Sequence, residues 1–380
     1  MKTNYSLTLA ALGLAACLPP AYAQLVIPSD GSDGAFNPGL SPTNVVIDLS
    51  QAVTGNWNAN NSANAGKGIY DASKWAVVFK YSSVNIPAGV AVRFKNHPTH
   101  APVVWLVREN ATNAGRIYLS GDLGQAGSAA LTPPEPGPGG FRGGVSGPAG
   151  TGVGLGIGNG GNGAYASVYG NPSILPLIGG SGGNGSGSWS GGAGGGAILI
   201  AVSGVLDNAG SIFSATAQGS GGSGGAVRII ASQVTGSGEI NCLLDGRVRI
   251  EANTLATSLR TSPETIRVSP ATPPLIWAPE AAPTVSIVAV STNATPADPT
   301  APLVSNADVA IEINAATTIT LETRNFPIEG VVEVRATQKW GGASWIRAWY
   351  VSGDQATAQW RATNTFVKGY TTLQARATAP

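Results

Sequence analysis

The sequence is poor in charged residues, and this scarcity excludes several kinds of protein. Only 11% of the 380 residues are Asp, Glu, Lys or Arg, and the formal net charge is +1. Disordered chains combine few apolar residues with a high net charge, whereas this chain is 43% hydrophobic, so we expect it to fold. A near-neutral chain without a cluster of Lys or Arg is not expected to bind nucleic acid or an anionic membrane.

Cysteine and histidine are rarer still, with two residues of each. Cys242 would be the single cysteine left if the N-terminus were removed, so we expect no disulfide and place Cys242 inside the fold as a small apolar residue. His97 and His100, spaced H-P-T-H, have no Cys, Asp or Glu close by to complete a metal site. We therefore expect a solvent-exposed turn there, and no metal or cofactor. Glycine runs such as GNGGNG and GGSGGNG lack the Lys-Ser/Thr of a phosphate-binding loop, so we do not expect them to hold a phosphate.

The N-terminus has the pattern of a signal peptide. Lys2 precedes an apolar run from Leu7 to Ala16 that is too short to span a bilayer, and Ala21-Tyr22-Ala23 has the A-x-A form of a cleavage site. We therefore expect residues 1–23 to be removed on export, which leaves a secreted or cell-surface protein without a transmembrane segment. The alternative is a lipoprotein, because Leu14-Ala15-Ala16-Cys17 resembles a lipoprotein box that would anchor the chain through an acylated Cys17.

Glycine is abundant but unevenly distributed. More than half of the 53 glycines fall between Gly121 and Gly196. Glycine contributes no apolar side chain, so no single hydrophobic core can form in such a segment. We interpret it as an insertion that either folds back over a sheet through its few apolar residues or stays disordered.

Segments with a similar order of apolar residues, polar residues and glycine lie before and after this insertion. Each joins an apolar strand, a polar turn ending in glycine and a second strand, and they begin at Trp75, Val103, Ala197 and Ala226, with a partial copy at Gly246. The turn glycines are Gly89, Gly115, Gly210 and Gly238, where we expect positive φ at the corners of a coil. In the last three full copies an isoleucine follows the glycine by two positions, which predicts a shared ladder of Ile117, Ile212 and Ile240.

Repetition at this spacing, with no helical period between the strands, predicts a parallel β-helix. A V-R-[IF] motif recurs at Arg93, Arg228 and Arg249, with each arginine between two buried positions. We expect these arginines to keep an outer sheet face soluble. A β-sandwich with glycine-rich hairpins is the alternative for this part of the chain.

The stretch GGGAILIAVSGVLDNAGSIFSA, followed by GGAVRIIASQVTGSGEI and GRVRIEA, resembles the glycine-rich β-helical segments of large bacterial secreted and surface proteins. In general style it is similar to right-handed, pectin-lyase-like β-helices. The resemblance covers roughly Asn44 to Ala252, and it implies a fold while implying almost nothing about activity.

The remainder of the chain changes character twice. Residues 253–302 are rich in Pro, Ala, Thr and Ser and predict an extended linker. Residues 303–380 return to short alternating strands without cysteine, which resembles an immunoglobulin- or fibronectin-type sandwich. The predicted fold class is thus all-β: a parallel β-helix over residues 24–252 with a glycine-rich insertion at about 121–196, then a β-sandwich.

Aromatic residues provide the strongest binding signal. Four tryptophans gather in the last domain, at Trp340, Trp345, Trp349 and Trp360. Trp345 and Trp349 are an even number of residues apart on S-W-I-R-A-W-Y, so we expect them on one side of one strand, where sugar rings could stack on the indole faces. The alternative is that this side packs the sandwich core.

Carboxylates provide a weaker signal. The β-helical segment offers acids that a polysaccharide-cleaving enzyme could use, namely Glu109, Asp122, Asp207, Glu239, Asp245 and Glu251. Asp207 and Glu239 flank corresponding turns, but an exposed acid that solubilises a coil edge is the simpler interpretation. We therefore expect an exported structural or adhesive protein without catalytic activity, whose partner is a cell-surface or extracellular polysaccharide. The alternatives are a β-helix lyase or hydrolase and a glycan-binding module.

Overall fold

The computed structural model describes residues 25–123, 134–145, 172–185, 187–215, 222–243, 245–295, 309–338, 343–369 and 371–380. Within these ranges the protein is all-β, apart from the 3-10 turns η1 (Leu49–Gln51) and η2 (Ser62–Asn64). The predicted signal peptide and Trp340 lie outside the described residues.

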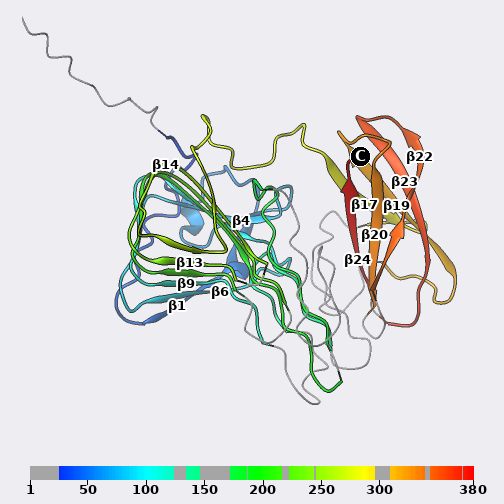
Figure 1. Ribbon diagram of the computed structural model, residues 1–380, viewed down its shortest axis with the longest axis horizontal. Coiled ribbons are helices and arrows are strands. Elements are labelled where there is room, and N and C mark those ends of the chain that lie inside the picture. The colour runs from blue at the N-terminus through cyan, green and yellow to red at the C-terminus, as the bar shows by residue number, and fades with distance from the viewer. Residues whose placement is uncertain are drawn as a thin grey trace, which may run out of the picture.

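The first part of the chain is a parallel β-helix built from two sheets (Figure 1). Sheet A is ten-stranded, and sheet B is six-stranded. The strands of sheet A are β2 (Val53–Thr54), β3 (Ile69–Asp71), β4 (Ala76–Tyr81), β5 (Val84–Ile86), β7 (Val103–Val107), β8 (Ala111–Asn113), β10 (Ala197–Asn208), β12 (Ala226–Thr235), β14 (Arg247–Leu255) and β16 (Ile266–Val268). Those of sheet B are β1 (Asn44–Asp48), β6 (Ala91–Lys95), β9 (Arg116–Tyr118), β11 (Ser211–Phe213), β13 (Glu239–Asn241) and β15 (Arg260–Ser262). Pairing is parallel throughout except between β3 and β4.

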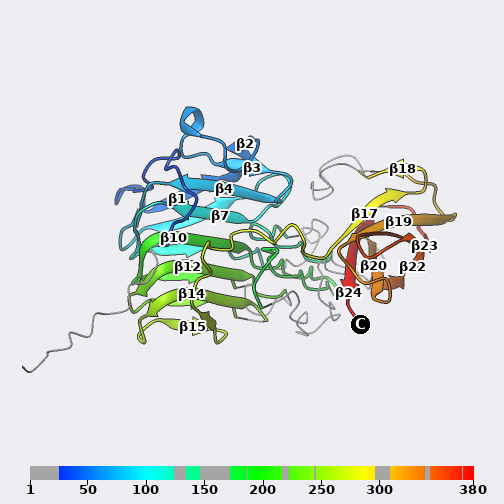
Figure 2. The same ribbon diagram turned by 90° about the horizontal axis from the view of Figure 1, so that it is seen from above.

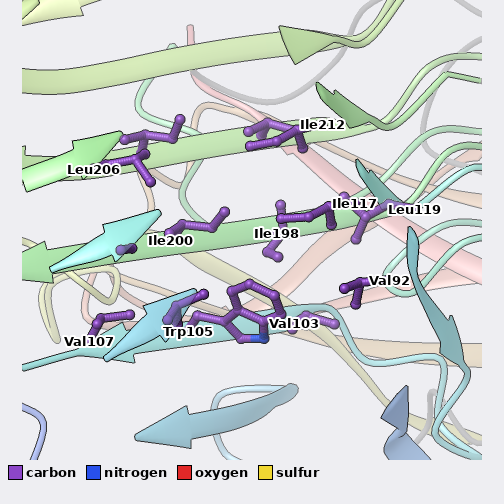
Figure 3. Close-up of a cluster of buried hydrophobic side chains, with 14 of the residues drawn as sticks. Val92, Val103, Trp105, Val107, Ile117, Leu119, Ile198, Ile200, Leu206 and Ile212 are labelled. Atoms are coloured by element: carbon purple, nitrogen blue, oxygen red, sulfur yellow. The ribbon is translucent and has the colours of Figure 1, made fainter. Parts of the chain in front are cut away.

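Successive coils stack in register, as the repeat predicted. Ile212 pairs with Ile117 on one side and with Ile240 on the other, so the isoleucine ladder is confirmed. Figure 2 shows β4, β7, β10, β12 and β14 one above another. The side chains that point between the two sheets form one apolar core, in which Trp105 and Ile117 are almost completely buried (Figure 3). Cys242 also lies in this core, as expected.

The middle strands of sheet A, namely β4, β7, β10 and β12, are covered on both faces, which the sequence interpretation missed. A second apolar layer lies on its outer face, where the N-terminal segment contributes Leu25 and Ile27 and the segment after the solenoid contributes Ile276. Strands buried on both faces have continuous apolar runs, and A-I-L-I-A-V in β10 is such a run. The prediction of a soluble outer face is therefore wrong for Arg228, which is 1% exposed and pairs with the buried Glu251.

The corner glycines are required for a different reason than expected. Gly89 has a φ of +85°, but Gly115, Gly210 and Gly238 do not have positive φ. A Cβ on Gly210 would lie 2.0 Å from the carbonyl oxygen of Gly115, and a Cβ on Gly238 would lie 2.0 Å from that of Gly210. These three glycines stack in a ladder where the backbones of neighbouring coils come too close for any side chain.

The described parts of the glycine-rich insertion form an ordered bundle of extended segments, which we call the glycine bundle: residues 134–145, 178–185, 190–196 and 222–225. Each segment of the glycine bundle forms backbone hydrogen bonds with several neighbouring segments, whereas a strand in a sheet bonds to at most two. The amide of Gly194 donates to Phe141, that of Phe141 to Gly180, that of Gly180 to Gly195, and that of Gly195 to Ser223. Because backbone groups satisfy one another, this packing needs no hydrophobic core. The described residues thus favour the folded-back insertion over the disordered one.

The second part of the chain is an antiparallel β-sandwich. Its five-stranded sheet contains β17 (Thr284–Val290), β18 (Asn293–Ala294), β19 (Ala316–Arg324), β22 (Trp349–Gly353) and β23 (Thr357–Thr365). Its three-stranded sheet contains β20 (Val331–Gln338), β21 (Ala343–Arg347) and β24 (Thr371–Thr378). Side chains from both sheets share one core, including Leu321, Val334 and Trp360. The segment 253–302, interpreted as a linker, supplies β15 and β16 to the solenoid and β17 and β18 to the sandwich.

Candidate binding surfaces

The tryptophans of the sandwich do not form one platform. Trp345 lies on β21 in the three-stranded sheet, whereas Trp349 lies on β22 in the five-stranded sheet. The chain crosses between the sheets at Ala348, which is buried. The expectation of one strand carrying both rings on the same side is therefore wrong, because a sandwich strand can pass from one sheet to the other without a turn that the sequence would reveal.

Trp345 and Trp360 have indole rings in close contact with other side chains of the sandwich, whereas the guanidinium carbon of Arg347 lies 5.8 Å from the ring centroid of Trp349. The guanidinium carbon of Arg376 lies 3.8 Å from the ring centroid of Trp345, so one face of that ring is covered by a cation–π contact. Trp360 is 3% exposed, and its Nε1 donates a 2.9 Å hydrogen bond to Thr323 Oγ1. Trp360 is thus a core residue, as the alternative interpretation held.

Trp349 is the described member of the group that faces solvent. It is 67% exposed and is followed on β22 by the exposed Tyr350 and Val351. β22 is the last strand on its side of the five-stranded sheet and carries no charged residue. We call these three residues the β22 strip, and it is an apolar surface of the kind that contacts sugar rings or other ligands.

A second surface is the outer face of sheet B, which the sequence interpretation did not identify. Arg93, Tyr118 and Phe213 occupy equivalent positions on neighbouring strands. The rings of Tyr118 and Phe213 stack with centroids 5.3 Å apart and planes 14° apart, and the guanidinium carbon of Arg93 lies 4.3 Å from the Tyr118 centroid. Tyr118 and Phe213 each follow a ladder isoleucine by one position, so the repeat itself contained the signal.

A groove runs beside this row along the glycine ladder. It has a volume of about 380 Å³. Three successive coils line it, and the lining residues are 89–91, 114–116 and 210–211. The groove exists because the corner residues have little or no side chain. Its size is in the range of small-molecule sites.

Three of the acidic residues that the sequence singles out lie apart from one another. Asp207 lies on sheet A and accepts a hydrogen bond from Thr235, whereas Glu239 lies on sheet B and accepts one from Asn241. Glu251 is buried in ion pairs with Arg228 and Arg249. Among the residues that the structure describes, no three His, Cys, Asp or Glu side chains are placed to hold a metal ion.

The two histidines lie in a polar cluster instead of an exposed turn, so that expectation is wrong. His97 stacks on Tyr70 with centroids 4.1 Å apart, and His100 Nε2 lies 3.5 Å from Glu135 Oε1. Glu135 also accepts hydrogen bonds from Arg142 and Asn96. These contacts fasten the first segment of the glycine bundle to the turn before β7, and the long sequence separation of Glu135 from the histidines hid them.

The pKa values in this cluster are shifted by burial. Burial lowers the pKa of His100, an effect that Glu135 opposes and Arg142 reinforces. Burial also raises the pKa of Asp122, and the nearby charge of Glu135 raises it further.

A histidine whose folded pKa lies below its unfolded value binds protons more readily when unfolded. Its contribution therefore makes the protein less stable as the pH falls through the unfolded pKa of about 6.5. We expect the free energy of unfolding to decrease slightly between pH 7.5 and pH 5.5, the window of about one unit on either side of that value, and the His100→Gln variant to lose part of this decrease. Urea titrations of both proteins at the two pH values measure it, and identical pH dependences would contradict it.

The sequence matches no family model, and no curated protein or solved structure shows detectable similarity to it. No helix in the described part of the chain is long and apolar enough to cross a membrane.

Proposed function

We propose that this protein is an exported structural or adhesive component of a bacterial cell surface or extracellular matrix. The observation that carries the proposal is the architecture of the solenoid, in which parallel coils stack around one apolar core and a second apolar layer covers the outer face of the middle strands of sheet A. Each coil contacts its neighbours along its whole length, and such stacks make stiff, extended surfaces. The finer resemblance to pectin-lyase-like β-helices and to immunoglobulin- or fibronectin-type sandwiches fits this role.

Export is part of the same proposal. The positively charged start, short apolar run and A-x-A site predict a mature chain that begins at Gln24. Mass spectrometry of protein purified from its own cells tests this cleavage, and a diacylated Cys17 at the N-terminus would show lipoprotein anchoring instead.

Glycan binding through the β22 strip is a second candidate function, and the exposure of Trp349 is the observation that favours it. A single exposed indole contributes roughly 1 kcal/mol by stacking on a sugar ring, so one module should bind weakly. Adhesion would then gain strength from many copies on a surface.

The test measures binding of the mature protein to a panel of immobilised polysaccharides. We expect weak binding that falls about fivefold in Trp349→Ala, the change that 1 kcal/mol of lost stacking produces. Trp189→Ala is the matched control, because Trp189 is a 57% exposed tryptophan in a different part of the chain. Equal losses in both variants would contradict a site at the β22 strip.

The same panel separates the structural and enzymatic proposals. We expect no release of reducing ends or unsaturated sugars, with or without Ca²⁺. Product formation that Asp207→Ala or Glu239→Ala abolishes would replace the structural proposal with a polysaccharide lyase or hydrolase.

A further inference from the structure

We propose that the free edge of β22 is a dimerisation site, where the strand pairs antiparallel with β22 of a second copy of this chain about a two-fold axis at Val351. The contact joins the five-stranded sheets of the two copies into one continuous sheet. It involves the backbone edge of β22 and the charges at its two ends, and it does not depend on the functions proposed above.

β22 has the features of a strand that is open to pairing. It pairs with β23 on one side, and no described strand pairs with it on the other. All five of its residues are exposed, and Figure 1 shows the strand on the side of the sandwich that faces away from the solenoid. An edge strand leaves backbone N–H and C=O groups available, and proteins commonly protect such edges with charged residues or proline. The sequence W-Y-V-S-G contains neither.

The ladder between β22 and β23 makes Val351 the centre of the free edge. Trp349 and Tyr350 pair with Arg361 and Trp360, and the register then shifts, so Val351 has no register partner on β23. A bulge of this kind leaves one residue of the strand unpaired. Pairing with a second copy would give Val351 the partner that it lacks on β23.

Antiparallel pairing about Val351 places large side chains opposite small ones. Residues equally far from Val351 in sequence lie opposite each other, so Trp349 faces the partner's Gly353 and Tyr350 faces the partner's Ser352. An aromatic ring opposite a small residue covers backbone that has no large side chain of its own. Tyr350 is held in place within its own copy, because its hydroxyl donates a 2.8 Å hydrogen bond to the carbonyl of Gly353.

The two ends of β22 carry opposite charges. Arg347 precedes the strand, Asp354 follows it, and both side chains are exposed. Neither forms an ion pair with another described residue. Glu333, the cross-strand neighbour of Arg347, pairs with Arg376 at 2.7 Å instead. The proposed register places Asp354 opposite the partner's Ala348 and therefore beside the partner's Arg347, and the two-fold axis repeats this contact.

Asp354 is oriented by the turn that follows β22. Its Oδ1 accepts hydrogen bonds from the backbone amides of Ala356 and Thr357 at 2.8 and 3.1 Å. Both bonds use the same oxygen, so Oδ2 can accept a hydrogen bond from a guanidinium group. The charges also select the antiparallel arrangement, because parallel pairing in register would place each Arg347 and each Asp354 beside its own copy.

The contact is small, because it consists of one pair of five-residue strands. Stable complexes bury about 1,200 Å² or more, and each exposed ion pair contributes little. We therefore expect a reversible dimer with a Kd in the micromolar range.

Sedimentation velocity of the mature protein, at concentrations from the micromolar to the millimolar range, measures this equilibrium. Val351→Lys should weaken the dimer about tenfold or more, since a lysine at the centre of the edge disfavours strand pairing. Val46→Lys is the matched control, because Val46 is a 59% exposed valine on β1, the edge strand of sheet B. It should change the Kd less than about twofold.

A double-mutant cycle tests the register. Arg347→Gln and Asp354→Asn each remove both ion pairs of the dimer, and asparagine keeps the oxygen that accepts the amides of the turn. We expect each single variant to weaken the dimer about fivefold, and the double variant to be no weaker than either single one.

A protein that stays monomeric throughout, or that forms open assemblies larger than a dimer, would overturn the proposal. A dimer that Val351→Lys leaves intact, or that Val46→Lys dissociates equally, would overturn it too, because the contact would lie elsewhere. Additive effects of Arg347→Gln and Asp354→Asn would contradict the two-fold register. Circular dichroism and melting temperatures establish that each variant is folded, since the four replaced side chains are exposed.

Discussion

Replacing Gly194 with Ala is expected to break the glycine bundle. An added Cβ would lie 1.9 Å from the carbonyl oxygen of Gly180 and 2.3 Å from its carbonyl carbon. Both obstacles are backbone atoms, and the segment around Gly180 is itself hydrogen-bonded to Phe141 and Gly195, so it cannot move aside without breaking those bonds. We expect a loss of about 3 kcal/mol or more in the free energy of unfolding, at the upper end for overpacking by one methyl group.

Denaturant unfolding and amide hydrogen exchange measure this effect together. If the bundle opens without unfolding the solenoid, protection should disappear at the amides of Gly180, Gly194 and Gly195 while β10 and β12 stay protected. Gly55→Ala is the control, because its Cβ would meet only the Ile69 side chain at an ordinary 3.8 Å, and its φ is not positive. A Gly194→Ala protein with unchanged stability and exchange would mean that the bundle is not packed as described.

The periodicity of the sequence was sufficient to predict the solenoid and its core ladder. Ile117, Ile212 and Ile240 occupy the same position in successive repeats. A buried ladder requires an apolar residue at that position in every coil, so the repeat in the sequence was enough to predict the packing. The outer layer on sheet A could not be predicted in the same way. It is built by Leu25, Ile27 and Ile276, which lie far away in the sequence and follow no repeat.

The candidate binding surfaces could also be predicted from the sequence only in part. The number of tryptophans in the last domain was enough to suggest that one of them, such as Trp349, is exposed. The sequence could not show which indole groups make contacts inside the sandwich, because the partners Arg376 and Thr323 lie on other strands and follow no periodic pattern. The glycine bundle was hidden for another reason. A glycine-rich segment is flexible when water solvates its backbone groups. Such a segment becomes ordered when several of them lie side by side and bond to one another, and the sequence does not show that arrangement.

Replacing Arg228 is expected to cause the second large loss of stability, because the charge of its side chain is buried. Its Nε and one amino group donate to Glu251 Oε1 at 2.9 and 2.7 Å, and the same amino group donates to the Leu275 carbonyl at 2.7 Å. Side-chain exposures are 2% for Arg228 and 4% for Glu251. Removing one partner of a buried pair leaves the other charge without compensation, which costs about 3–5 kcal/mol.

We therefore expect Arg228→Met to lower the free energy of unfolding by about 3 kcal/mol, at the lower end of that range because Arg249 still contacts Glu251 at 2.8 Å. Arg228→Asp should cost more, since it adds a second carboxylate beside the first. Arg260→Met is the control: Arg260 is 75% exposed, and its loss should cost under about 0.5 kcal/mol. The double variant Arg228→Met/Glu251→Leu removes both buried charges and should recover much of the lost stability, because a buried pair replaced by apolar groups is often neutral. Urea denaturation of the four variants measures these differences. If Arg228→Met is as stable as Arg260→Met, the outer face of sheet A is solvated, and the layer formed by Leu25, Ile27 and Ile276 does not cover it.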